Sequence, residues 1–176
     1  MRTFICIDFP LEIEKEIERL QKILLKKKFT GKLTEPETLH LTLKFLGELS
    51  PEEVEKVKAK LKEIKFPVLN LKLDHLGTFN HQGNPRIVWL KLIGANKLQN
   101  QIDIALKDRF LIENRFMSHL TLARVKYVKD KSGFIDYVKQ IKPMKLKFQA
   151  SSFKLKESTL SPQGPEYKLI EEYSLL

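Results

Sequence analysis

The sequence predicts an α+β fold made by internal duplication, with two mainly antiparallel sheets, helices packed outside them and a central cleft between two lobes. The tetrapeptide HLTL occurs twice, at residues 40–43 and 119–122, and the order of strand-like and helix-like segments around it repeats. Alternating apolar and polar residues are typical of antiparallel strands with one buried face. No Gly/Ser linker separates the halves, so we expect residues 1–176 to form a single domain of two pseudo-symmetric lobes.

The first half of the chain carries three strand patterns and two helix patterns. Apolar residues between positions 11 and 28 recur at helical spacing, with charged residues on the opposite face. The stretch Ser50-Pro51-Glu52-Glu53 is a capping box with proline at the first helical position, which predicts the start of a helix. The predicted elements are a strand at 2–9, a helix at 11–28, a strand at 39–46, a helix from 50 to about 64 and a strand at 68–79.

The second half repeats this order after a turn rich in Asn, Gly and Pro. A proline precedes the long alternating strand in both halves, Pro67 in the first and Pro143 in the second. The same succession of strand, helix, HLTL strand, helix and long strand indicates a duplication of about half the chain. The predicted elements are a turn at 80–85, a strand at 87–92, a helix at 95–110, a strand at 119–127, a helix at 131–141 and strands at 145–155 and 167–173.

Composition favours a globular protein of the cytoplasm. The chain has 176 residues, 42% of them hydrophobic, which is enough to bury a core. The single cysteine, Cys6, excludes an internal disulfide and fits a reducing compartment. Its apolar surroundings predict a buried strand position and not a reactive thiol. The apolar run Phe4–Ile7 is too short for a signal sequence or a membrane span, so we expect no membrane association.

The formal net charge of +10 has two interpretations. Excess lysine and arginine attract polyanions such as nucleic acids. A composition rich in Lys and Glu is also found in heat-adapted proteins, where the charges serve stability. Charge alone does not decide between the two.

The two HLTL copies each place a histidine and a threonine on one strand face. Because side chains alternate across a strand, the two leucines of each copy face one way and His and Thr the other. Leu41, Leu43, Leu120 and Leu122 are therefore expected in the core. If the two halves pack about a rough two-fold axis, His40, Thr42, His119 and Thr121 meet across a groove.

Such a set of side chains suits phosphoryl transfer. In-line displacement at phosphorus needs a proton taken from the nucleophile and another given to the leaving oxygen, and imidazole serves both purposes near neutral pH. Threonine hydroxyls donate to the non-bridging oxygens, where negative charge develops. Arg124 follows the second copy and offers a guanidinium for the phosphate. A regular strand would place Arg124 on the face of Leu122, so a twist or the strand end must turn it to the phosphate.

The remaining motifs argue against a metal or a nucleotide cofactor. His75 is predicted on a strand, structural or at the edge of the groove, and His81 in the turn. There is no HExxH motif, no cysteine cluster and no glycine-rich phosphate loop. We therefore predict a reaction without metal and without cofactor.

The two HxT motifs, one in each half of a duplicated α+β chain, resemble those of the 2H phosphoesterase superfamily. The chain is most similar to the bacterial and archaeal RNA 2′,3′-cyclic phosphodiesterases, long described as 2′-5′ RNA ligases. The resemblance covers nearly the whole chain. It includes the segments RTFICIDFP, HLTLKFLGEL, LGTFNHQGNPRIVWLKL, HLTLARV and ESTLSPQGPEYKLIEEYSL.

The resemblance implies a bilobal fold that carries both motifs in its cleft. It implies hydrolysis of a terminal 2′,3′-cyclic phosphate of RNA to a 2′-phosphate, without a metal. His40 would be the proton donor and His119 the proton acceptor, although the near symmetry leaves this assignment open. Thr42, Thr121 and Arg124 would bind the phosphate. RNA with 2′,3′-cyclic phosphate ends, such as tRNA fragments, would be the partner of a monomeric enzyme.

Three alternatives share the same residues. The site could run in reverse and join RNA ends through a 2′-5′ linkage, although hydrolysis in water is downhill. The chain could be a binding module for RNA ends or nucleotides that no longer turns over, but a pure binder needs no pair of proton-transfer groups. A purely structural interpretation makes the basic surface a heat adaptation and leaves the paired histidines unexplained.

Overall fold

The structure, a computed structural model, describes residues 1–176. Its order of elements follows the predicted order closely. The helices are α1 (Leu11–Leu24), the short 3-10 helix η1 (Pro36–Thr38), α2 (Pro51–Lys62), α3 (Asn96–Leu106) and α4 (Lys131–Gln140). The strands are β1 (Arg2–Ile7), β2 (Thr30–Leu33), β3 (Leu41–Glu48), β4 (Leu69–His81), β5 (Asn84–Ile93), β6 (His119–Tyr127), β7 (Lys147–Ala150), β8 (Ser152–Ser161) and β9 (Gly164–Ser174).

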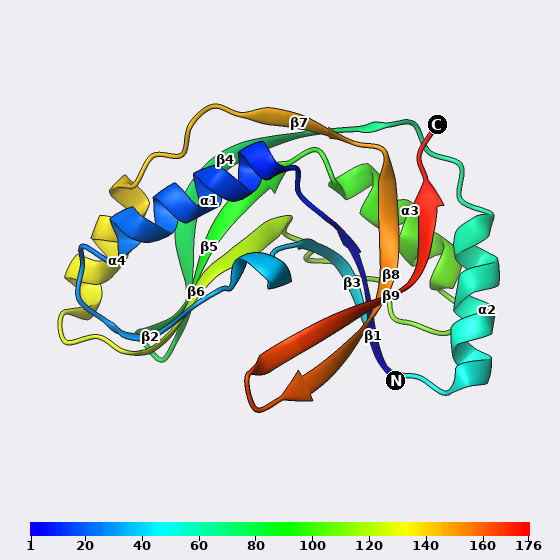
Figure 1. The fold of residues 1–176 in the computed structure, drawn as a ribbon, viewed down its shortest axis with the longest axis horizontal. Coiled ribbons are helices and arrows are strands. Elements are labelled where there is room, and N and C mark those ends of the chain that lie inside the picture. Colours follow the sequence, from blue (N-terminus) through cyan, green and yellow to red (C-terminus); the bar gives the residue numbers. More distant parts are fainter.

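The strands form two antiparallel sheets, which confirms the predicted fold class. Sheet A has four strands in the order β3-β1-β8-β9, and sheet B has five in the order β2-β6-β5-β4-β7. Helices α1 and α4 lie together over sheet B, while α2 and α3 lie beside sheet A (Figure 1). Helices therefore pack on the outer faces, and the inner faces of the two sheets look toward each other.

The two halves of the chain exchange elements between the lobes. The first half contributes β1, β3 and α2 to the lobe of sheet A, but its α1 and β4 belong to the lobe of sheet B. The second half does the converse: β5, β6 and α4 belong to sheet B, while α3 and β8 belong to sheet A. Neither half can therefore form its lobe by itself, and each HLTL strand lies in a different sheet.

A single apolar cluster fixes both HLTL strands. Forty buried residues form this cluster, and it includes all four leucines of the two motifs. Leu41 and Leu122 have no exposed surface at all, and Leu43 and Leu120 have almost none. Burying a leucine stabilises a fold by about 1.5–3 kcal/mol, so this anchoring holds the facing His and Thr side chains in place. The predicted orientation of the four leucines is confirmed.

Two parts of the predicted element order are wrong. The segment 145–155 is not one strand, because the chain crosses at Ser151 from sheet B, where β7 pairs with β4, to sheet A, where β8 pairs with β1. Alternation gives the period of a strand but does not tell which sheet it joins. Strand β2 was not predicted, because this short edge strand is polar and largely exposed and has no alternating pattern.

The predicted turn at 80–85 is tighter than expected. Strand β4 continues to His81 and β5 begins at Asn84, so the loop consists of Gln82 and Gly83 alone. Both have positive φ, 50° and 75°, as a type I′ hairpin turn requires. His81 accordingly ends a strand and does not lie in a loop.

A buried ion pair fastens α3 to sheet A. Lys44 of β3 donates to the Asp103 carboxylate and to the Leu111 carbonyl, and both charged side chains are buried. Asp103 also accepts from the Gln99 side chain and from the Glu113 amide, each at 2.8 Å. Burial acts to raise the pKa of Asp103, but these donors hold it below its ordinary value.

Two further expectations concern the first strand and the membrane. Cys6 is fully buried in β1, and burial raises its pKa to about 12, as expected for a structural thiol. None of the four α-helices is long and apolar enough to cross a membrane.

We expect Asp103→Ala to lower the free energy of unfolding by about 3–5 kcal/mol, because it leaves the Lys44 ammonium buried without its counter-ion. Urea denaturation at neutral pH measures the change. The matched control is Glu52→Ala, which breaks the exposed Lys56–Glu52 pair and should leave the free energy of unfolding nearly unchanged. Equal losses in the two variants would contradict the prediction.

Candidate active site

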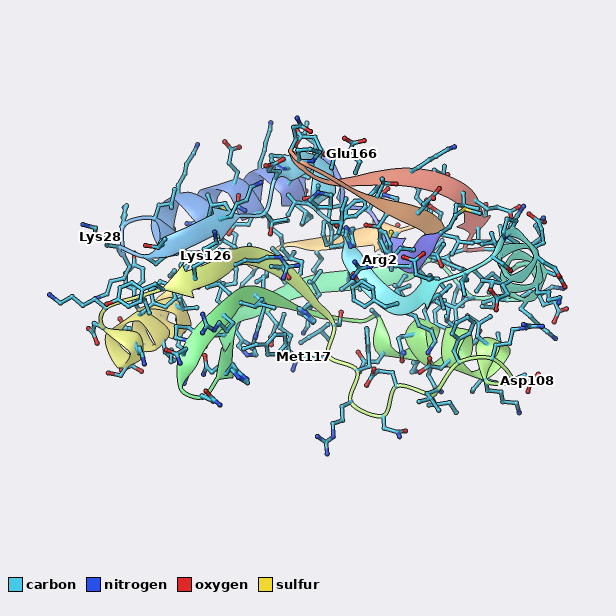
Figure 2. The ribbon with its side chains drawn as sticks, turned by 90° about the horizontal axis from the view of Figure 1, so that it is seen from below. Arg2, Lys28, Asp108, Met117, Lys126 and Glu166 are labelled. Atoms are coloured by element: carbon cyan, nitrogen blue, oxygen red, sulfur yellow. The ribbon has the colours of Figure 1, made fainter.

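A cleft of about 770 Å³ lies between the inner faces of the two sheets. All five residues predicted from the sequence line it: His40, Thr42, His119, Thr121 and Arg124. In Figure 2, which shows the molecule from below, Arg2 marks sheet A, Met117 lies just before the start of β6, and Lys126 lies near the end of β6 in sheet B. The structure therefore brings together the two motifs that lie about half the chain apart.

A β-bulge in β6 turns Arg124 into the cleft. Consecutive residues of β5, Val88 and Trp89, pair with Ala123 and Thr121, so that Leu122 is the extra residue. Leu122 and Ala123 are both buried, and the alternation restarts after them. Arg124 therefore shares the cleft face with Thr121. This bulge explains how Arg124 reaches the site although a regular strand would point it into the core.

An equivalent bulge in β3 brings Phe45 to the cleft. Consecutive residues of β1, Ile5 and Cys6, pair with Lys44 and Thr42, so that Leu43 is the extra residue. Phe45 lines the cleft with 72% of its surface exposed. It occupies the position of Arg124 when the two HLTL copies are superposed. The sequence carried this signal in HLTLKF and HLTLAR, but it was missed because regular alternation was assumed.

Both histidines are held in the same tautomer by the same contact. Nδ1 of His40 lies 2.7 Å from the Thr38 carbonyl oxygen, and Nδ1 of His119 lies 2.7 Å from the Met117 carbonyl oxygen. A carbonyl only accepts, so each Nδ1 must carry the hydrogen and donate it. Nε2 of each ring is then the nitrogen free for proton transfer in the cleft.

The surroundings of His40 are strongly apolar. Its ring packs against Phe4, with ring centroids 4.8 Å apart, and against Tyr167, with centroids 5.1 Å apart. Burial lowers the pKa of His40 to about 4; the bond to the Thr38 carbonyl opposes this shift, and the charge of Lys156 adds to it. Burial also raises the pKa of Tyr167, against the influence of nearby Arg124. In the free protein His40 is therefore a neutral imidazole at pH 7.

His119 has aromatic neighbours from its own sheet. Phe79 packs edge-on against its ring, with centroids 5.1 Å apart. Phe79 in turn contacts Trp89, whose indole lies across Gly77 so closely that a Cβ there would come within 2.4 Å of it. The absence of a side chain at Gly77 thus lets Trp89 lie flat and support Phe79.

The other two histidines stay outside the cleft. His75 lies on β4, with Nδ1 2.7 Å from the Asp74 carboxylate, and packs against Trp89. His81 is exposed at the end of β4. No group of three or more His, Cys, Asp or Glu side chains that could hold a metal comes together anywhere in the chain.

The cleft, its two HxT motifs and the exchanged lobes agree with one family. The family described as LigT like phosphoesterase matches residues 7–89 and 93–167. This chain belongs to the LigT-like phosphoesterases. Both HxT motifs, Arg124 and Phe45 lie within the matched residues, as does Tyr167 at their end.

Relatives of known name cover the whole chain. The protein is 33% identical to the RNA 2′,3′-cyclic phosphodiesterase of Methanocaldococcus jannaschii, with 98% of this chain and 100% of that one covered. It is 32% identical to the enzyme of the same name from Archaeoglobus fulgidus, with 96% and 97% covered. These two similarities extend over both lobes and both motifs.

Two solved structures have the same fold. The crystal structure of the Thermus thermophilus protein TT0787 superposes with a TM-score of 0.84 at 25% identity, covering 99% of this chain and 98% of that one. The crystal structure of Escherichia coli LigT complexed with 3′-AMP superposes with a TM-score of 0.79 at 26% identity, covering 99% and 97%. The chain therefore has the LigT fold over nearly all of the length compared.

We expect the His40 ring to titrate near pH 4 in the free protein, and not near 6.5. The unfolded chain takes up this proton near pH 6.5 and the folded protein only near 4, so His40 contributes stability above pH 6.5 that is lost as the pH falls toward 4. NMR titration of the histidine rings and urea unfolding at pH 7 and pH 5 measure both effects. His40→Asn is the control and should lose less stability over this interval than the wild type. A ring that titrates at 6.5 contradicts the prediction.

Proposed function

We propose that the protein hydrolyses the terminal 2′,3′-cyclic phosphate of RNA to a 2′-phosphate. The observation that carries this proposal is the pair of histidines, one from each lobe, that line one cleft in the same tautomer. The family and the relatives named RNA 2′,3′-cyclic phosphodiesterase support the same substrate.

In the proposed reaction, water attacks phosphorus and the bond from phosphorus to O3′ breaks. His119 accepts a proton from the attacking water through Nε2, and His40 gives a proton to the departing O3′. The products are a 2′-phosphate and a free 3′-hydroxyl. His40 ends neutral and His119 ends protonated, and proton exchange with solvent restores both.

The negative charge of the substrate allows His40 to take up a proton from solvent. A proton donor must carry the proton before the bond breaks, whereas free His40 is neutral at pH 7. The cyclic phosphate brings one negative charge into the cleft, and a nearby anion raises the pKa of an imidazole. Because Phe4 and Tyr167 keep water from this ring, the attraction is screened little. Substrate binding thus prepares the acid.

The remaining cleft residues stabilise the phosphorane-like transition state. Thr42 and Thr121 lie two residues after the histidines on the same strand faces, so that their hydroxyls can donate to the non-bridging oxygens. Arg124 adds a permanent positive charge from the same face of β6. Negative charge on these oxygens increases in the transition state, so these groups bind the transition state more strongly than the ground state. This difference is the requirement for catalysis.

Oligomeric state, location and cofactor requirement are also part of the proposed function. We propose a monomer formed by one domain of two lobes that works in the cytoplasm on RNA such as tRNA fragments. We also propose that it needs no metal or other cofactor, because the two imidazoles already supply the acid and the base.

We expect His40→Ala and His119→Ala each to lower the rate of cyclic phosphate opening by about 10²–10⁴-fold, because each removes one proton-transfer group. The assay uses a short RNA that ends in 2′,3′-cyclic phosphate, with EDTA present, and follows the appearance of the 2′-phosphate end. His81→Ala, which changes a histidine outside the cleft, is the matched control.

Four other outcomes would change the proposal. Full activity in both cleft variants would remove the histidines from the mechanism. Loss of wild-type activity in EDTA would require a metal. RNA that binds without being cut would favour a binding module, and RNA ends joined by a 2′-5′ linkage would favour ligation.

We expect Phe45→Ala to raise KM for RNA, because the exposed ring of Phe45 beside the phosphate site offers a stacking surface for a base. Loss of one base–aromatic stack costs about 1–3 kcal/mol. Steady-state kinetics on the same RNA measure the effect, and kcat should stay close to that of the wild type. Phe45→Tyr keeps the ring and should behave like the wild type; an unchanged KM in Phe45→Ala would exclude the stack.

A further inference from the structure

The inner face of sheet B continues beyond His119 as an open basic surface. Helices α1 and α4 cover the other face of this sheet. The strand register places Lys91 opposite His119 and Lys72 opposite both Ile93 and Lys147. Paired residues share a face, so Lys91, Lys72 and Lys147 lie on the same side of the sheet as His119.

These three lysines have no carboxylate within ion-pair distance, unlike Lys154 and Lys156, which pair with Asp8. Asp74 is the only acidic residue in the five strands of sheet B, and it is hydrogen-bonded to His75. The positive charge of this face is therefore not neutralised within the protein.

A shallow groove of about 350 Å³ lies at the far end of this face. Lys72 and Lys147 line it together with Asn70 and Gln149, and the Gln149 amide donates to the Asn70 side-chain oxygen at 3.1 Å. Lysine ammonium groups and amides are groups that bind phosphate and sugar oxygens without regard to base sequence.

The opposite end of the cleft is bridged by the β8–β9 hairpin. Lys32 of β2 donates to the carbonyl of Gln163 at the hairpin tip, 3.5 Å away, and pairs with Glu35. Lys32 is paired with Arg124, so this bridge lies at the end of β6 away from His119. The hairpin, marked by Glu166 in Figure 2, lies across the lobes there. A chain attached to a phosphate in the cleft therefore finds its open path on the His119 side.

We propose that Lys91, Lys72 and Lys147 form a track for the sugar–phosphate backbone of the RNA strand on the 5′ side of the terminal cyclic phosphate. The proposal rests on the proposed function, because it takes the cyclic phosphate to lie between His40 and His119. The track adds affinity for longer RNA without selecting a sequence. A cyclic mononucleotide, which has no upstream phosphate, gains nothing from it.

The test compares Lys72→Gln/Lys147→Gln with the wild type on two substrates, a single-stranded hexanucleotide ending in 2′,3′-cyclic phosphate and adenosine 2′,3′-cyclic phosphate. We expect kcat/KM for the hexanucleotide to fall about tenfold at low salt and that for the mononucleotide to stay within about twofold. Lys28→Gln/Lys139→Gln is the matched control, because it removes the same charge from the helix-covered side and leaves no carboxylate unpaired. It should match the wild type on both substrates.

Binding of the same hexanucleotide, labelled with fluorescein at its 5′ end, separates this proposal from the proposed function. Fluorescence anisotropy should show Kd raised about tenfold in Lys72→Gln/Lys147→Gln, and the slope of log Kd against log salt reduced by about 0.7 for each lost phosphate contact. If neither substrate is cut by the wild type, the proposed function fails, while this binding difference still supports the track. Unchanged Kd and unchanged salt slope in the double variant would overturn the track even if catalysis is intact.

Discussion

Two β-bulges, one after Thr42 in β3 and one after Thr121 in β6, determine which side chains face the cleft. Each bulge keeps two successive residues in the core and then returns the strand to the cleft. In β6 the second buried residue is Ala123, which needs no partner. In β3 it is Lys44, and a buried ammonium requires a counter-ion. The ion pair between Lys44 of β3 and Asp103 of α3 is therefore a consequence of the same β-bulge that turns Phe45 to the cleft.

The two lobes give each histidine the same tautomer but not the same surroundings. The rings of Phe4 and Tyr167 both pack against His40, whereas His119 has one edge-on contact with Phe79. Tyr167 comes from β9, which flanks β8 in sheet A as β7 flanks β4 in sheet B, but β9 has 11 residues and β7 only four. Burial lowers the pKa of His40, and Tyr167, which β9 brings against the His40 ring, contributes to that burial.

Much of the fold and of the site followed from the sequence because both depend on strand alternation. The alternation of side chains along a strand was enough to predict that Leu41 and Leu120 face the core and that the histidines beside them face the other way. What failed depended on information that alternation lacks. At Ser151 the chain passes from sheet B to sheet A, because the two halves exchange elements between the lobes. Phe45 is exposed because of the β-bulge in β3. Tyr167 reaches His40 from a distant strand, which no local pattern predicts.

The net charge of +10 was interpreted either as attraction to nucleic acid or as a source of stability, and the positions of the charges bear on this choice. On α2, Lys56 and Lys58 pair with glutamates of the same helix, the arrangement expected where charges serve stability. On sheet B the excess is left unpaired beside the cleft that holds both histidines. Keeping like charges together on one face costs free energy through mutual repulsion, so a packing advantage does not explain them. A polyanion that lies along the face relieves this repulsion, and its attraction weakens as salt rises. The stability interpretation thus accounts for one part of the surface, and the proposed RNA track accounts for the other.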